Sequence, residues 1–292
     1  MSHAPRIFDR ALQRRRLTRA LEGGFGDFLL SRVVDDLMDR LSTVSRRFER
    51  ALDLGTPIDA AAVVLTRSGA VGQVVRVATV AGAARPGDIV ADEEALPLAP
   101  ERFDLAISAL SLHHVNDLPG ALVQVRRALR PDGLFLAAFL GGETLTELRQ
   151  SLTLAEAELE GGASPRVAPF ADLRDLGGLL QRAGFALPVA DVDRVTVRYR
   201  DPVALMRDLR GMGLTNTLAE RSRKPLRRAT LVRACEMYME RFAAADGRLP
   251  ATFDILWLSG WAPDESQQKP LRPGTARVSL ADVLPDRSRR ST

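Results

Sequence analysis

Three short segments of this 292-residue chain end in side chains that could hold a ligand or move a proton. Asp53 and Gly55 close "ALDLG", Asp92 and Glu93 lie in the acidic turn "ADEEALPL", and His113 lies in "SALSLHHVND". A carboxylate accepts hydrogen bonds from adenine or ribose, a glycine lets backbone approach a ligand, and a histidine exchanges protons near neutral pH. These residue types suit a nucleoside-containing cofactor with His113 beside it as a base or donor.

Each segment also fits a purely structural role. A capping or turn aspartate gives the same pattern as Asp53, a solvated turn explains Asp92 and Glu93, and a structural hydrogen bond explains His113. Leu110, at the end of the apolar segment 103–110, is a further candidate contact for the cofactor.

The turn after Gly55 departs from a nucleotide-binding turn. Such turns run Gly-x-Gly-x-Gly, whereas this chain continues with Thr56, Pro57, Ile58 and Asp59. Proline removes one backbone N–H donor, and Asp59 places negative charge where a cofactor carboxylate would rest. The segment 74–84 also offers no carboxylate for the ribose hydroxyls. We therefore expect a cofactor to bind weakly here, or not at all.

The elements that position these residues follow from the hydrophobic pattern. Apolar, strand-like segments alternate with helical ones, which predicts an α/β fold with a doubly wound, mostly parallel seven-stranded sheet. The predicted strands are 50–55, 73–80, 88–91, 103–110, 134–140, 192–200 and 251–261. N-terminal helices precede them and a helical insertion precedes the last strand. Ligands of such sheets bind at the carboxyl ends of the strands, where all three segments lie.

Composition excludes several classes of function. One cysteine, Cys235, rules out an internal disulfide and a multi-cysteine zinc site. The histidines are His3, His113 and His114, and the imidazoles of the adjacent pair are expected to diverge, so no metal site is predicted. The 41 basic residues scatter among 37 acidic ones with only two Tyr and two Trp, which argues against nucleic-acid binding.

The chain is expected to be cytoplasmic, because no apolar stretch approaches the roughly 20 residues of a membrane span and no secretory signal is evident. The basic run "RALQRRRLTRA" (10–20) fits a solvated helix face, a partner-binding helix or a helix at a membrane surface.

Longer motifs resemble one family. The matching stretches are "IFDRALQRRR", "ALDLG", "ADEEALPL", "FDLAISALSLHHVNDLPGAL", "LRPDGLFLAAFLGGETLTELRQSL", "DLRGMGLTN" and "PATFDILWLSGW" followed by "ESQQKP". In order from about Ile7 to Leu280, they closely resemble the complex I assembly factor 5 family of the class I methyltransferase superfamily, which has a Rossmann-like fold. The chain also resembles the malonyl-carrier-protein methyltransferase of biotin synthesis.

The resemblance implies a bacterial protein without a presequence that uses S-adenosylmethionine, weakly if at all, and modifies a protein during respiratory complex I assembly. Arginine hydroxylation of a peripheral-arm subunit is the implied reaction, at the inner face of the cytoplasmic membrane. Glu143, in "GGETLTELR", is a catalytic candidate besides His113 and would bind the cationic arginine, although a first-turn helix residue explains it equally. Two alternatives stay open: methylation of a protein or small molecule, and a non-catalytic assembly chaperone.

The implied domain organisation has three parts. Residues 1–45 form helices that pack on the core, and residues 46–262 form a methyltransferase-like domain with a helical insertion at about 201–248. Residues 263–292, rich in Pro, Arg and Ser, are expected to be a loosely ordered tail.

Overall fold

The computed structural model describes residues 6–168 and 173–268. In these residues it contains one seven-stranded sheet in the order β3-β2-β1-β4-β5-β7-β6, in which β7 runs antiparallel to both neighbours. The strands are β1 (Phe48–Leu54), β2 (Val71–Ala78), β3 (Ile89–Val90), β4 (Phe103–Ala109), β5 (Leu129–Gly141), β6 (Ala186–Tyr199) and β7 (Leu249–Trp261). This topology confirms the predicted fold class.

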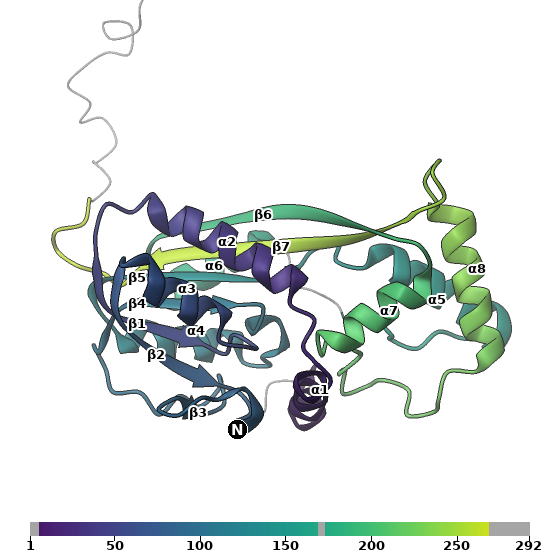
Figure 1. Ribbon diagram of the computed structural model, residues 1–292, viewed down its shortest axis with the longest axis horizontal. Coiled ribbons are helices and arrows are strands. Elements are labelled where there is room, and N and C mark those ends of the chain that lie inside the picture. The colour runs from purple at the N-terminus through teal and green to yellow at the C-terminus, as the bar shows by residue number, and fades with distance from the viewer. Residues whose placement is uncertain (1–5, 169–172, 269–292) are drawn as a thin grey trace, which may run out of the picture.

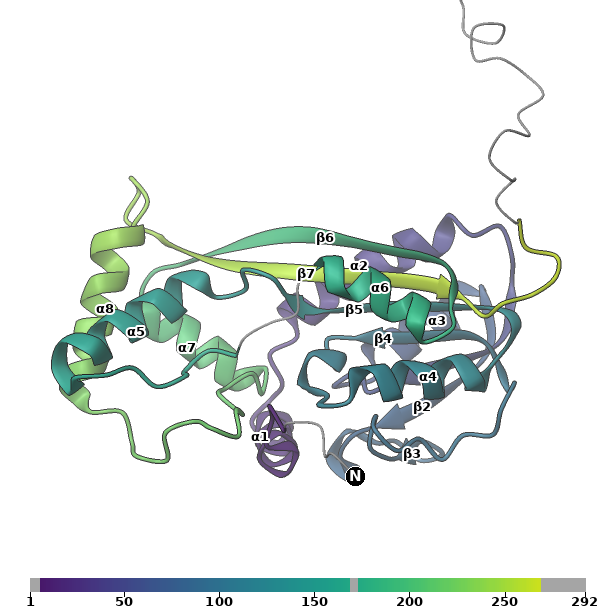
Figure 2. The ribbon, with the colours of Figure 1, turned by 180° about the vertical axis from the view of Figure 1, so that it is seen from behind.

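Helices cover both faces of the sheet, α2 and α3 on one and α4 and α6 on the other (Figures 1 and 2). The helices are α1 (Arg10–Glu22), α2 (Phe28–Ser42), α3 (Ala60–Ser68), α4 (Leu118–Ala128), α5 (Thr146–Glu160), α6 (Leu173–Arg182), α7 (Pro202–Gly211) and α8 (Arg228–Phe242), with short 3-10 turns η1 (Ala81–Ala83) and η2 (Leu112–His114). Helix α4 begins where the sequence predicts, because the Asp117 carboxylate accepts from the Gly120 N–H at 2.9 Å.

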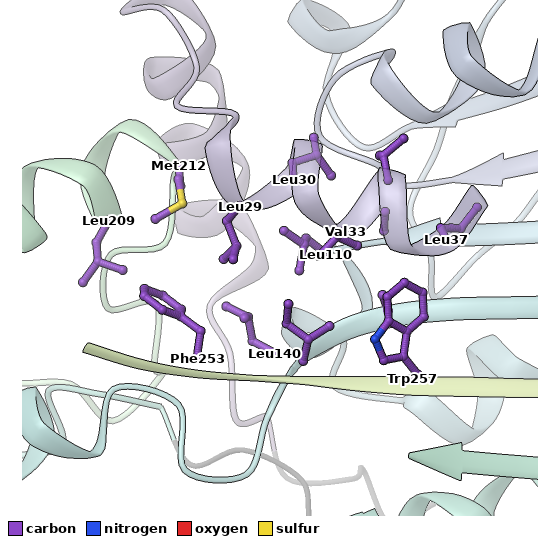
Figure 3. Close-up of a cluster of buried hydrophobic side chains, with 14 of the residues drawn as sticks. Leu29, Leu30, Val33, Leu37, Leu110, Leu140, Leu209, Met212, Phe253 and Trp257 are labelled. Atoms are coloured by element: carbon purple, nitrogen blue, oxygen red, sulfur yellow. The ribbon is translucent and has the colours of Figure 1, made fainter. Parts of the chain in front are cut away.

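The larger core lies under α2. Leu29, Val33 and Leu37 recur at four-residue spacing and are completely or almost completely buried. Figure 3 shows this stripe above Trp257 of β7, with Leu110 beside it. Burial of the stripe holds α2 across the strands, as its periodicity predicts.

Helices α5, α7 and α8 form a lobe beside the long ends of β6 and β7 (Figure 1). Helices α7 and α8 connect β6 to β7, and α8 packs on α5. The Tyr238 hydroxyl donates to the Pro250 carbonyl at 2.7 Å, which ties α8 to the start of β7. The lobe faces the carboxyl end of β5, where a substrate would approach. The boundaries that we predicted for the three parts of the chain stay predictions.

The C-terminal segment begins in contact with the sheet. Ala262 is buried, its N–H donates to the Gly133 carbonyl at 2.8 Å, and the Gln267 side chain donates to Asp132 at 3.0 Å. These contacts hold residues 262–268 against the start of β5, and residues 269–292 of the predicted tail lie outside the described residues. None of the helices in residues 6–168 and 173–268 combines the length and apolar character that crossing a bilayer requires.

Candidate functional site

The carboxyl end of β1 holds a buried ion pair. Asp53 of β1 and Arg76 of β2 face each other in the strand register, and both are at most 1 % exposed. The Arg76 Nε lies 3.6 Å from the Asp53 Oδ2. The Thr56 hydroxyl donates to the other Asp53 oxygen, and Arg76 donates to the Thr56 carbonyl at 2.6 Å. Arg76 therefore holds the turn after Gly55, residues 56–59, against β2. This turn, which lacks the glycines of a nucleotide-binding turn, is called the overwritten turn below.

Arg76 has further partners in the loop after β2. It contacts Asp88 at 3.2 Å and donates to the Ala83 carbonyl of η1. Burial raises the pKa of Asp53 to about 6, although the Thr56 hydrogen bond and the Arg76 charge partly oppose that rise. Asp53 thus serves the packing of the turn and is sealed from solvent.

The space above Gly55 is filled by side chains. Gly55 has φ +71°, and a Cβ at this position would collide with the Ser111 hydroxyl and lie 3.0 Å from a Glu93 oxygen. The Ser111 hydroxyl donates to Glu93 at 2.5 Å, and Glu93 is completely buried. In methyltransferase-type folds this space belongs to the cofactor. Here it contains a serine–glutamate hydrogen bond.

Helix α1 closes the same edge from outside. Arg10 forms an ion pair with Glu93, contacts Asp92 at 2.9 Å and donates to the His114 carbonyl at 3.2 Å. Arg14 pairs with the other Asp92 oxygen. Burial opposes ionisation of Asp92, but hydrogen bonds to its carboxylate and the two arginine charges lower its pKa overall. Asp92 is therefore a charged anchor for α1.

These contacts fill the space next to Gly55 at the predicted S-adenosylmethionine site. The space over Gly55 is filled, the end of β2 has no ribose carboxylate, and Asp59 of the overwritten turn points to the surface, where it pairs with Arg85 at 3.1 Å. Asp53 and Asp92 do not share a crevice: Asp53 is sealed, whereas Asp92 lines an open groove of about 480 Å³ beside α1. In this conformation the residues do not fit the cofactor.

An apolar cavity of about 170 Å³ lies next to this edge, between the sheet and the helical lobe. Leucines from β5, α5 and α7 form its walls, and His113 and His114 of η2 form one end. The residues that line it are Phe8, His113, His114, Leu140, Leu145, Leu148, Leu152, Arg166, Val167, Ala168, Met206, Leu209, Leu214, Thr215, Asn216 and Thr217. It lies at the carboxyl ends of β4 and β5, where such sheets bind substrates.

The expectation that the adjacent imidazoles diverge is wrong. The His113 and His114 ring centroids are 4.2 Å apart, and both rings line the cavity, because η2 turns the chain tightly after β4. Burial lowers the pKa of His113 well below its usual value, and burial together with the Arg10 charge lowers the pKa of His114 to about 3. Both rings are neutral near pH 7.

Glu143 and Leu110 lie outside the cavity. Glu143 is exposed on the loop after β5, 3.9 Å from Arg149, and its N–H donates to Asp254 at 2.9 Å. The structure therefore does not bring Glu143 and His113 together. Leu110 packs in the core under α2 (Figure 3). Among the described residues, no group of three or more His, Cys, Asp or Glu side chains could hold a metal ion.

Sequence reasoning missed three residues that shape this edge: Arg10, Arg76 and Ser111. Arg76 carries a signal, since it is a single charge inside the apolar segment "QVVRVATV" and a buried charge requires a partner. Arg10 was hidden in a run of arginines. Ser111 becomes visible only when β4 and the acidic turn are placed together.

Comparison with known proteins agrees with the fold. A family model described as a methyltransferase domain matches residues 52–137. The YcgJ protein from Bacillus subtilis has a similar structure, with a TM-score of 0.53 at 14% identity over 78% of this chain and 98% of that one. At this identity the likeness concerns the fold alone.

Two groups of relatives match nearly the whole chain. The mitochondrial arginine-hydroxylase NDUFAF5 of Danio rerio is 41% identical over 95% of this chain and 89% of its own length, and that of Homo sapiens is 40% identical over 95% and 83%. The malonyl-[acyl-carrier protein] O-methyltransferase of Gallionella capsiferriformans is 31% identical over 88% of this chain and 92% of its own.

Proposed function

The chain belongs to the NDUFAF5 arginine-hydroxylase family, within the class I methyltransferase superfamily, and from this premise we propose that it hydroxylates an arginine side chain of a protein during assembly of respiratory complex I. The observation that carries the proposal is the identity of 41% across 95% of the chain. The substrate would be a subunit of the peripheral arm of complex I, met at the inner face of the cytoplasmic membrane.

The cavity supports this proposal as the place where the target side chain enters. Its volume of about 170 Å³ resembles the roughly 150 Å³ of an apolar protein cavity that holds benzene, so it can take the aliphatic stem of an arginine. His113 and His114 are neutral there, and a neutral imidazole accepts a hydrogen bond from a guanidinium without repelling its charge.

Hydroxylation replaces one C–H bond of the target with a C–O–H group. One oxygen atom of dioxygen enters that bond, and the other takes up two electrons and two protons and leaves as water. Dioxygen and a two-electron reductant are therefore co-reactants that the reaction needs in addition to this chain and its target. The part of this chain in the reaction is to bind and orient the arginine and to exclude water.

The filled cofactor edge favours hydroxylation over methylation. Methyl transfer needs S-adenosylmethionine as the methyl donor, and the contacts of Ser111, Glu93 and Arg10 beside Gly55 argue against a bound cofactor there. Hydroxylation has no such requirement. We therefore keep methylation of a protein or small molecule as the less favoured reaction.

Intact mass spectrometry of the peripheral-arm subunits tests the proposal. Subunits from a strain that lacks this protein should be lighter, by one oxygen atom, than those from the parent strain. A difference of one methylene group instead would show methylation, and either that result or equal masses in the two strains would overturn hydroxylation.

The same filled edge supports a second candidate function, a non-catalytic chaperone of complex I assembly. A protein that holds its target without chemistry has no use for a cofactor site. Here the residues at that edge contact one another, through the Asp53–Arg76 ion pair and the hydrogen bond from Arg76 to the Thr56 carbonyl. Equal subunit masses together with a complex I assembly defect in the deletion strain would favour this function.

A further inference from the structure

A groove between α1 and α7 gathers four arginines. It has a volume of about 650 Å³, and Arg16, Arg19, Arg207 and Arg210 line it, whereas none of the described residues that line it is acidic. Arg16 and Arg19 are three residues apart in α1, as are Arg207 and Arg210 in α7, and side chains at that spacing share a helix face. Helices α1 and α7 are distant in sequence but lie next to each other (Figure 1), and arginines of both line the groove.

Pairing with the protein's own carboxylates does not explain this cluster. Within residues 6–168 and 173–268, Arg19, Arg207 and Arg210 form no ion pair. Arg19 and Arg210 lie in the last turns of their helices, where a cation interacts favourably with the helix dipole. That role accounts for two of the arginines, and a hydrogen bond to the protein's own backbone holds Arg16, so the position of Arg207 has no such explanation.

Arg16 is held in a cationic environment. Its guanidinium donates to the Asn216 carbonyl, and partial burial together with the charges of Arg221 and Arg19 lowers its pKa. Each of these charges raises the electrostatic cost of the others, and a bound anion would offset that cost. The geometry is therefore more favourable with an anion present.

The groove also has the size and access of a ligand site. Its volume falls in the range of roughly 300–1,000 Å³ for small-molecule pockets. Gly23, Gly24 and Gly211 line it, so little side-chain bulk blocks an approach to the backbone. Thr215 lines both this groove and the apolar cavity, which places the two side by side.

We propose that the α1–α7 groove binds a phosphate group of an organic ligand. The planar guanidinium of arginine matches a phosphate in a bidentate geometry, and four of them around one space suit a group with several anionic oxygens. The phosphate could belong to a soluble phosphorylated molecule or to the headgroup of a phospholipid. The proposal does not depend on arginine hydroxylation.

Titration calorimetry of the full chain with inorganic pyrophosphate at low ionic strength tests the site. The double variant Arg207→Ala/Arg210→Ala should bind at least roughly tenfold more weakly, because it removes two of the four guanidinium groups that line the groove. The control is Arg47→Ala/Arg67→Ala, which removes the same charge from exposed positions outside the groove and should bind like the parent protein.

Vesicle sedimentation separates the two sources. Binding to phosphatidylglycerol but not phosphatidylcholine vesicles, lost in Arg207→Ala/Arg210→Ala, supports a lipid headgroup; pyrophosphate binding without vesicle binding supports a soluble ligand. The proposal is overturned if neither pyrophosphate nor phosphatidylglycerol vesicles bind, or if both double variants weaken binding equally. Binding of a polyglutamate peptide without pyrophosphate or vesicle binding also overturns it, since the groove would then serve an acidic protein.

Discussion

At the scale of single residues, Arg76 decides what Asp53 can do. Its guanidinium occupies the side of Asp53 that faces β2 and also bonds the Thr56 carbonyl and Asp88. A carboxylate in this position is sealed away from a cofactor. Its burial makes the charged form of Asp53 less stable in the folded protein. This effect is measurable through the pH dependence of stability.

The substitution Asp53→Asn should change that pH dependence. The folded-state pKa of about 6 lies above the 3.8 of the unfolded chain, so between these values the folded protein holds a proton that the unfolded chain has released. Asp53 therefore destabilises the folded state as the pH rises through 6. Relative to the parent, Asp53→Asn should gain stability as the pH rises from about 4 to about 6, by up to about 3 kcal/mol, and the difference should stay level above that. Urea denaturation measures this difference.

The matched control is Asp59→Asn, at an exposed carboxylate of the same turn that pairs with Arg85. Its effect on the free energy of unfolding should be small and nearly independent of pH. If the effect of Asp53→Asn is equally flat across this range, Asp53 is not buried as described.

Arg10 should contribute strongly to stability, because its loss leaves Glu93 buried without a cationic partner. Arg10→Met should lower the free energy of unfolding by roughly 3–5 kcal/mol, and adding Glu93→Gln should restore part of that loss. The control Arg15→Met, on the exposed face of the same helix, should cost little. Equal effects of Arg10→Met and Arg15→Met in urea denaturation would contradict a stabilising ion pair between Arg10 of α1 and Glu93.

At the scale of elements, the cavity exists because pieces from distant parts of the chain meet. Helix α5 supplies Leu148 and Leu152, η2 supplies the two histidines, and the loop after α7 supplies the segment 214–217. Phe8 closes one side, and its neighbour Asp9 donates its N–H to the Thr217 carbonyl at 2.8 Å. The helical lobe and the N-terminal segment are thus walls of the same site.

Filling this cavity should stop the modification without unfolding the protein. Leu152→Phe adds volume inside the cavity and should cost about 1–3 kcal/mol of stability. Leu154→Phe, two residues along α5 at an exposed position, is the control. In a deletion strain complemented with Leu152→Phe, the target subunit should lack the added oxygen, whereas Leu154→Phe should restore it. Restoration by both variants would show that the cavity is not the substrate site.

The elements were predictable because their signals are local. The strands and α4 followed from apolar segments, from Asp117 as a cap and from Pro119 in the first turn. The site was not, because its contacts join distant residues: Arg10 and Glu93 are 83 residues apart, and Arg76 meets Asp53 only through strand register. The spacing of residues along the sequence does not predict which distant side chains pair in this way.

At the scale of the whole molecule, the protein keeps the methyltransferase architecture while its own side chains occupy the cofactor edge. The strand order identifies the methyltransferase fold, and the 41% identity to a mitochondrial arginine-hydroxylase identifies the family. The overwritten turn Thr56–Asp59, the Arg76 ion pair and the α1 contacts all act on one edge of the sheet. These contacts brace this edge with the protein's own side chains and need no ligand to do so.

The most direct test of this account is calorimetric titration of the purified chain with S-adenosylmethionine. The malonyl-[acyl-carrier protein] O-methyltransferase of Gallionella capsiferriformans serves as the positive control, since it shares 31% identity and its name states a methyl transfer. We expect saturable heat from the control and none from this protein up to millimolar ligand. Saturable binding by this protein, weakened by Asp92→Ala, would contradict the account, because the cofactor would then have to displace Arg10 and α1.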